Sequence, residues 1–185
     1  MVTRADWLEA GLTVLAEEGA PALTIERLTE RMGLSKGSYY HHFKGAGGFR
    51  TALLEYFEAQ FTARLIDTVE EKPEADAATK LKRLLDLVLA DDAKVQLEIA
   101  VRAWALQDAE ARAAQERVDH TRTQYLQRLC RGLDSKQVDD PDRLARLLYL
   151  ILIGAEQVLP PLPSSELREL YAMTLRLATG ESLLD

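Results

Sequence analysis

Apolar side chains recur three and four positions apart along most of this 185-residue chain, which is the spacing of one face of an α-helix. Ala and Leu abound, while Gly, Pro and β-branched residues are sparse, which also favours helices. The chain is therefore predicted to be all-α. The expected helices cover residues 3–19, 24–33, 35–42, 48–70, 75–89, 94–106 and 108–131, one from 141 to the prolines that begin at 160, and a last one from 164 or 165 through 177.

Residues 23–43, LTIERLTERMGLSKGSYYHHF, form the most distinctive segment. Thr24 and Ser35 are good N-caps, because each hydroxyl can accept a hydrogen bond from a backbone N–H of the following turn. Gly33 suits a left-handed helix end. Two short helices joined by a tight turn are predicted, and Tyr39 and Phe43, four positions apart, share the inward face of the second helix.

The outward face of that second helix carries short polar, basic and aromatic side chains. Lys36 suits guanine acceptors or phosphate, and Gly37 leaves room for the DNA backbone or a thymine methyl group. Side chains further along the helix can reach phosphate oxygens. The segment predicts a helix that enters the DNA major groove, with contacts from Thr24, Ser35, Lys36, Gly37, Ser38, Tyr40, His42 and Lys44.

The run Lys36-Gly37-Ser38-Tyr39-Tyr40-His41-His42-Phe43 follows a capped helix, a Gly and a short apolar residue. This arrangement resembles the helix-turn-helix of the TetR (tetracycline-repressor-like) family over about residues 5–50. The resemblance implies a three-helix DNA-binding domain at residues 1–46 and a helical effector-binding and dimerisation domain at residues 47–185. It also implies a homodimeric repressor that a small molecule releases from a pseudo-palindromic double-stranded DNA operator.

One position departs from the family pattern. Family members commonly place a phosphate-contacting Lys shortly after the Phe, where this chain has Ala46 among Gly45, Gly47 and Gly48. These glycines weaken the start of the next helix, which predicts a mobile hinge and a helix that begins at Gly48. The alternative function is a dimeric helical ligand-binding or interaction protein with weakened operator recognition.

The net charge of −7 is unevenly distributed. Residues 1–50 hold six basic and six acidic residues, so the remainder, with 17 basic and 24 acidic residues, supplies the whole net charge. We call residues 1–50 the head. Because the head has no net charge, it is expected to make few phosphate contacts per subunit, so operator binding should require the heads of two subunits. The single Cys130, the lack of an apparent signal sequence and a longest apolar run of only residues 147–155 predict a cytoplasmic protein without a membrane span.

The last two predicted helices are apolar on more than one side. Asp140 and Pro141 mark the start of the first of them. One of its stripes can face the protein's own core and another a partner, since a helix that is apolar nearly all round must be covered on both sides. The expected homodimer interface consists of Leu147, Ile151, Gly154, Val158, Leu170, Met173 and Leu177, and the alternative is a large monomer core.

Large apolar or amphipathic side chains on the middle helices are candidates for an effector pocket, although each also fits an ordinary core. These candidates are Phe57, Phe61, Leu84, Leu87, Arg102, Trp104, Tyr125 and Tyr149. Arg102 could meet an anionic group or pair with Glu98 one turn earlier. Because so few polar groups stand out, the favoured effector is a small hydrophobic molecule.

Other chemistries have weaker support. Glu116, Asp119 and His120 lie at i, i+3 and i+4 and could hold a divalent metal, but a solvated charged face is the simpler interpretation. Cys130 has no evident partner and fits a small core residue. The sequence contains no phosphate-binding glycine loop and no serine-nucleophile motif. The chain is thus expected to hold no metal or cofactor and not to be an enzyme.

Overall fold

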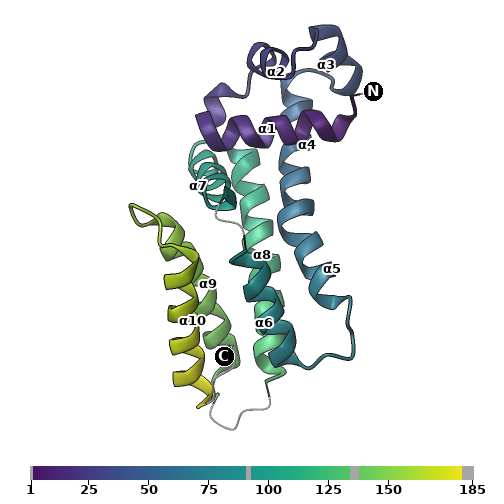
Figure 1. The fold of residues 1–185 in the computed structure, drawn as a ribbon. Helices are drawn as coiled ribbons and strands as arrows, with labels where there is room; N and C mark the ends of the chain where they lie inside the picture. Colours follow the sequence, from purple (N-terminus) through teal and green to yellow (C-terminus); the bar gives the residue numbers. More distant parts are fainter. Residues whose placement is uncertain (1, 91–92, 134–137, 181–185) are drawn as a thin grey trace. The chain divides into compact units, whose positions relative to one another are not determined.

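The structure is a computed structural model that describes residues 2–90, 93–133 and 138–180. Within these ranges all regular structure is helical, which confirms the fold class that the apolar spacing predicts (Figure 1). The helices are α1 (Arg4–Glu18), the 3₁₀ turn η1 (Ala20–Ala22), α2 (Ile25–Met32), α3 (Lys36–His42), α4 (Ala46–Glu58), the π turn η2 (Ala59–Ala63), α5 (Arg64–Glu70), α6 (Ala77–Val88), α7 (Ala93–Ala105), α8 (Ala109–Arg131), α9 (Pro141–Gln157) and α10 (Ser164–Thr179).

The chain forms two compact units. One contains the residues up to Phe61 together with Gln96–Arg117, and the other contains Thr62–Val95 together with the residues from Val118 on. In the first unit α1 contacts α2 and α4, and α2 contacts α3; in the second, α9 and α10 lie side by side (Figure 1). This division by packing differs from the functional boundary between residues 46 and 47, which stays a prediction.

The first three helices begin and end where their capping residues predict. Thr3 and Asp6 form a capping box at the start of α1, with Thr3 N–H donating to Asp6 Oδ2 at 2.7 Å. The Thr24 and Ser35 hydroxyls accept from the backbone N–H groups three residues later. Gly33 ends α2 in the left-handed region at φ 63°, where a side chain would be strained.

A cluster of aromatic rings fixes α3 to the helices beneath it. Tyr39 and Phe43 are buried, as their four-residue spacing predicts. The Tyr39 ring lies edge-on to Trp7 of α1, with centroids 5.5 Å apart, and the Phe43 ring lies edge-on to Phe49 of α4, with centroids 4.9 Å apart. Edge-to-face contacts of this kind stabilise a defined ring geometry, so the inward face of α3 has a fixed position on α1 and α4.

The start of α4 differs from the prediction. The helix begins at Ala46 and includes Gly47 and Gly48 in its first turn, so the predicted start at Gly48 is wrong. Gly45, at φ 101°, takes the strained backbone conformation that precedes the helix, which leaves the next two glycines free to be helical. The predicted mobility of residues 45–48 stays a prediction.

The predicted single helix over residues 48–70 is interrupted. Residues Ala59–Ala63 form a π turn between α4 and α5. Thr62 in this turn is buried, and its hydroxyl accepts a hydrogen bond of 3.0 Å from Nε of Arg122 in α8. An apolar period cannot reveal one extra residue in a helical turn, which is why the sequence predicts a continuous helix.

The second unit has a leucine-rich core to which α6, α8, α9 and α10 contribute. Tyr171 of α10 is buried and donates a hydrogen bond of 3.3 Å to the carbonyl of Leu148 in α9. Asp140 caps α9 as predicted, accepting from Arg143 N–H at 2.9 Å. A serine does not cap α10: Ser164 is already helical, and Pro163 holds the extended N-cap position without a side-chain hydrogen bond. None of the helices in the described ranges is both long and apolar enough to cross a bilayer.

Candidate nucleic-acid interface

The outward face of α3 is open to solvent while its inward face is anchored. Tyr40 is 56% exposed, and Ser35, Lys36, Gly37 and Lys44 are also exposed. Ser38 and His42 are half-buried at the flanks of this face, and Thr24 is exposed at the start of α2. The structure therefore leaves the predicted DNA-contacting residues accessible.

Tyr39 shows how the anchor works chemically. Its hydroxyl donates to the carbonyl of Gly45 at 3.4 Å, across the end of α3. Burial raises the pKa of Tyr39 to about 12, because a phenolate would be poorly solvated there. The phenol thus stays a neutral donor at physiological pH, and it links α3 to the first residue before α4.

Two hydroxyls at this surface have structural as well as potential binding roles. Thr24 Oγ1 lies 3.2 Å from the Arg27 nitrogen, and Ser35 Oγ lies 3.3 Å from the Ser38 nitrogen. Both oxygens therefore serve as acceptors within the helix caps. A hydroxyl that accepts one hydrogen bond can still donate its own hydrogen, so each remains a possible donor to a phosphate oxygen.

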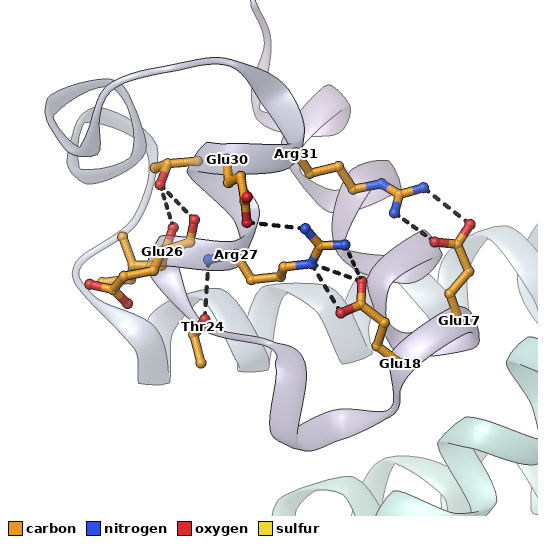
Figure 2. A network of polar contacts seen from close by, with 9 residues as sticks. Glu17, Glu18, Thr24, Glu26, Arg27, Glu30 and Arg31 are labelled. Atoms are coloured by element: carbon orange, nitrogen blue, oxygen red, sulfur yellow. Dashed lines mark hydrogen bonds and ion pairs between the residues drawn. The ribbon is translucent and has the colours of Figure 1, made fainter.

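Carboxylates engage the arginines of α2. Arg27 lies between two of them: its Nη2 is 2.7 Å from Glu18 Oε1, and its Nη1 is 3.1 Å from Glu30 Oε2 (Figure 2). Arg31 makes a two-pronged contact with Glu17 of α1, with one nitrogen–oxygen distance of 2.6 Å. These hydrogen bonds raise the pKa of both guanidinium groups. The two arginines therefore bind α2 to neighbouring carboxylates.

Lys36 also has an acidic partner, which sequence reasoning did not identify. Its ammonium forms an ion pair with the carboxylate of Glu26 in α2. The two residues are ten positions apart on different helices, so no helical spacing relates them. The one available signal was that Glu26 belongs to the polar side of α2, the helix next to α3.

The remaining basic side chains of the head differ in availability. Arg4 lies over the Phe43 ring, 5.5 Å from its centroid. Arg50 forms an ion pair with Asp108, at 2.8 Å. Lys44 is exposed and has no hydrogen bond or ion pair with any residue that the structure describes. Among the basic side chains of the head, Lys44 is therefore the most available to a phosphate. Several of the others have carboxylate partners, because residues 1–50 hold as many acidic as basic residues.

Comparison with known proteins bears on this arrangement directly. Residues 8–46, which include most of α1 and all of α2 and α3, match the family of bacterial regulatory proteins called the tetR family. The N-terminal part of the chain is therefore similar to the TetR family of transcriptional regulators. The transcriptional regulator AcuR of Cereibacter sphaeroides is 35% identical to it over 60 residues, which make up 32% of this chain and 27% of AcuR.

Solved structures resemble this chain over nearly its whole length. A transcriptional regulator of Saccharomonospora viridis in complex with choline has a TM-score of 0.78 at 19% identity, covering 94% of this chain and 95% of that one. The regulatory protein TetR of Rhodobacter sphaeroides has a TM-score of 0.76 at 22% identity, covering 92% and 96%. At these identities the similarity concerns the fold.

The predicted ligand-binding residues of the chain fall into both compact units. Phe57 and Phe61 stack in the first unit, with ring centroids 5.3 Å apart, and Trp104 lies under the Arg50 guanidinium at 5.0 Å. Arg102 is also in the first unit, whereas the second contains Leu84, Leu87, Tyr125 and Tyr149.

Both tyrosines of the second unit have carboxylate partners. Tyr125 donates to Glu70 at 2.8 Å, and Tyr149 donates to Asp119 at 2.7 Å. Asp119 thus has a structural partner in addition to the metal role considered for it. Among the described residues, no group of three or more His, Cys, Asp or Glu side chains is arranged to hold a metal ion. The buried Cys130 has a pKa raised to about 12 by burial, which is typical of an inert core thiol.

The last two helices of the chain present apolar side chains to solvent. One apolar stripe of α9 is buried or half-buried, and it consists of Leu144, Leu148, Leu152 and Ala155. In the stripe predicted to face a partner, Leu147, Gly154 and Val158 are exposed and Ile151 is half-buried. On α10, Met173 and Leu177 are exposed and Leu170 is half-buried. The structure adds two exposed leucines that the sequence analysis did not include, Leu150 and Leu159.

Proposed function

We propose that this chain is a ligand-responsive repressor that binds a pseudo-palindromic operator as a homodimer and is released by a small hydrophobic effector. The observation that carries the proposal is α3, whose inward face is anchored by Tyr39 and Phe43 while its outward face exposes Lys36, Tyr40 and Lys44. An anchored helix with an open polar and basic face is what major-groove recognition requires.

In this proposal residues 1–46 bind DNA, and residues 47–185 bind the effector and the second subunit. Lys36 contacts a base edge or phosphate, whereas Tyr40, His42 and Lys44 contact phosphates. The exposed apolar side chains of α9 and α10 support a dimer, because isolated large apolar patches on a soluble surface commonly mark an interface. Two subunits then place two copies of α3 in successive major grooves, about one helical turn apart.

Effector release follows from linkage between the two binding sites. The aromatic side chains of the middle helices, including Phe57, Phe61 and Trp104, support a largely hydrophobic ligand. The effector favours a conformation in which the two heads no longer fit the operator, and DNA must weaken effector binding by the same factor. A ligand that binds without altering operator affinity would contradict this part of the proposal.

The proposal is tested by fluorescence anisotropy with a duplex from the chain's own upstream intergenic region and an unrelated duplex of equal length. We expect the upstream duplex to bind at least about 10³-fold more tightly at physiological salt. Lys44→Ala should weaken binding to both duplexes and reduce the slope of log K against log salt by about 0.9 per subunit.

Lys72→Ala serves as the matched control. Lys72 is an exposed lysine of the second unit, outside the predicted DNA-binding face, so its loss should leave both affinities unchanged. Tyr40→Phe should weaken operator binding about three- to tenfold, since it removes one hydrogen bond to phosphate. Equal and weak binding of both duplexes by the wild-type protein would contradict operator recognition.

The second candidate function is a dimeric helical ligand-binding or interaction protein with weakened operator recognition. The observations that favour it are Ala46 in place of a cation and the engagement of Lys36 by Glu26. This function predicts a stable dimer and ligand binding together with no preference for the upstream duplex, which the same titration would detect.

A further inference from the structure

Glu26 and Lys36 form an exposed pair on the surface predicted to meet DNA. Their side chains remain 69% and 58% exposed, so solvent surrounds the contact. The hydrogen bond from Lys36 lowers the pKa of Glu26, which keeps the carboxylate ionised at physiological pH. An exposed ion pair of this kind has a small free energy of formation, so another acceptor can displace it.

The pair differs from the other ion pairs of the head in what it connects. Glu17 and Glu18 hold Arg31 and Arg27, and Glu30 also contacts Arg27 (Figure 2). Those contacts involve cations of α2. Within the described residues, Glu26 is the carboxylate that holds a cation from the outward face of α3. The Glu26 carboxylate and the Lys36 ammonium have no second side-chain hydrogen bond or ion pair there.

When a duplex is bound, Glu26 and the DNA compete for the Lys36 ammonium. A phosphate is present on every duplex, and exchanging a carboxylate for a phosphate gains Lys36 little while it leaves Glu26 near a negatively charged backbone. A guanine edge at the right position offers Lys36 two acceptors in fixed geometry. The exchange is therefore favoured only where that edge is present.

Resting on the proposed DNA-binding function, we infer that Glu26 is a specificity-determining residue: it holds Lys36 in an ion pair that operator bases displace and unrelated phosphates do not. Its effect is to lower the affinity for unrelated DNA more than the affinity for the operator. An acidic group on a DNA-binding surface generally weakens DNA binding, and here that weakening falls mainly on unrelated DNA.

Glu26→Gln tests the inference, with both duplexes titrated over a salt series. We expect the variant to bind the unrelated duplex about fivefold more tightly and the upstream duplex less than twofold more tightly, so that selectivity falls. The salt slope with the unrelated duplex should steepen by about 0.9 per subunit, because Lys36 now contacts phosphate.

Two further variants separate this mechanism from a general effect of charge. Glu30→Gln removes an equally exposed carboxylate of the same helix that pairs with Arg27, and it should leave selectivity unchanged. In a Lys36→Gln background, Glu26→Gln should no longer alter binding to the unrelated duplex. An equal gain from Glu30→Gln, or a gain that persists without Lys36, would overturn the inference.

The inference and the proposed function fail in different ways. If wild-type protein binds neither duplex, the proposed function fails and the role of Glu26 in specificity fails with it. If the wild-type protein selects the upstream duplex and Glu26→Gln keeps the same selectivity, the inference alone is overturned. The ion pair itself has a readout without DNA, since Glu26→Gln should lower the pKa of the Lys36 ammonium measured by NMR.

Discussion

Gly11 sets the distance between α1 and α4. It lies on the buried face of α1, together with Trp7, Leu8 and Leu15. A Cβ at this position would lie 2.6 Å from Cζ of Phe49 and 3.0 Å from Cδ1 of Leu53. Both side chains are fully buried, so neither can move aside without disturbing the aromatic cluster that anchors α3.

We therefore expect Gly11→Ala to lower the free energy of unfolding by about 1–2 kcal/mol, measured by urea denaturation. Overpacking of a buried contact costs about 1–3 kcal/mol, and the better helix propensity of Ala offsets about 0.5–1 kcal/mol of it. The same variant should weaken operator binding, since the position of α3 depends on Phe49. Unchanged stability would mean that the Phe49 ring has room to shift.

At this scale, sequence prediction succeeded for contacts that are local in the chain. Thr24, Ser35 and Gly33 act within three residues of their own position, so the helix caps could be inferred from residue type. The ion pair between Lys36 and Glu26 could not, because it depends on how two helices cross. The same limit applies to the close contact of Gly11 with Phe49.

The first turn of α4 contains two glycines where a side chain would fit. A Cβ at Gly47 meets nothing within 4 Å, and one at Gly48 meets only Lys44 Cβ, at 3.8 Å. Replacing either helical glycine by Ala removes backbone freedom from the unfolded chain. We expect Gly47→Ala and Gly48→Ala each to raise the free energy of unfolding by about 0.5–1 kcal/mol in urea denaturation.

Gly45→Ala is the matched control for these two variants. Gly45 has φ 101°, a conformation that L side chains rarely adopt, so Ala there should lower the stability by about 1–2 kcal/mol although space is available. Stabilisation at position 45, or destabilisation at 47 and 48, would contradict the helix start at Ala46.

Glu70 connects α5 to α6 and α8. Its carboxylate accepts from Lys80 Nζ at 2.6 Å and from the Tyr125 hydroxyl at 2.8 Å, and Arg128 lies 3.5 Å away. The hydrogen bond from Lys80, followed by that from Tyr125, lowers the pKa of Glu70 below its ordinary value. The carboxylate is thus more readily ionised in the folded chain than in the unfolded chain.

This depressed pKa predicts an acid-dependent contribution to stability. A group whose pKa is lower in the folded state stabilises the fold above its unfolded pKa, and the contribution disappears as the pH falls through the folded pKa. Glu70→Gln should lower the free energy of unfolding by about 1 kcal/mol at pH 7, after allowance for solvent screening. The difference between wild type and variant should shrink below about pH 4 and vanish at lower pH. A difference that stays constant with pH would contradict this role.

The helices themselves were largely predictable, because apolar spacing and capping residues are repeated along each one. The ends of α6, α7 and α8 lie within two residues of the predicted positions. The π turn at Ala59–Ala63 and the start of α4 at Ala46 were not predicted. Both depend on the backbone conformation at a single position, and a pattern averaged over several helical turns does not detect it.

For the whole molecule, two features favour the predicted self-association. The head is electrically neutral, which limits the phosphate contacts of one subunit. The chain also exposes Leu147, Leu150, Met173 and Leu177 on its last two helices. Covering these side chains with a second copy would remove apolar area from water and would also join two heads.

Leu177→Glu tests the dimer with Leu106→Glu as its control. The two leucines are 79% and 77% exposed in the single chain, but Leu177 belongs to the predicted interface and Leu106 follows α7 in the other unit. Burial of a leucine contributes about 1.5–3 kcal/mol, so Leu177→Glu should raise the dimer dissociation constant about 10- to 100-fold or more in gel filtration with light scattering. Leu106→Glu should leave the dimer intact at micromolar concentration. A monomeric wild-type protein, or equal dissociation of the dimer in both variants, would contradict an interface through α9 and α10. A monomer that still selects the upstream duplex would show that one head suffices for operator binding.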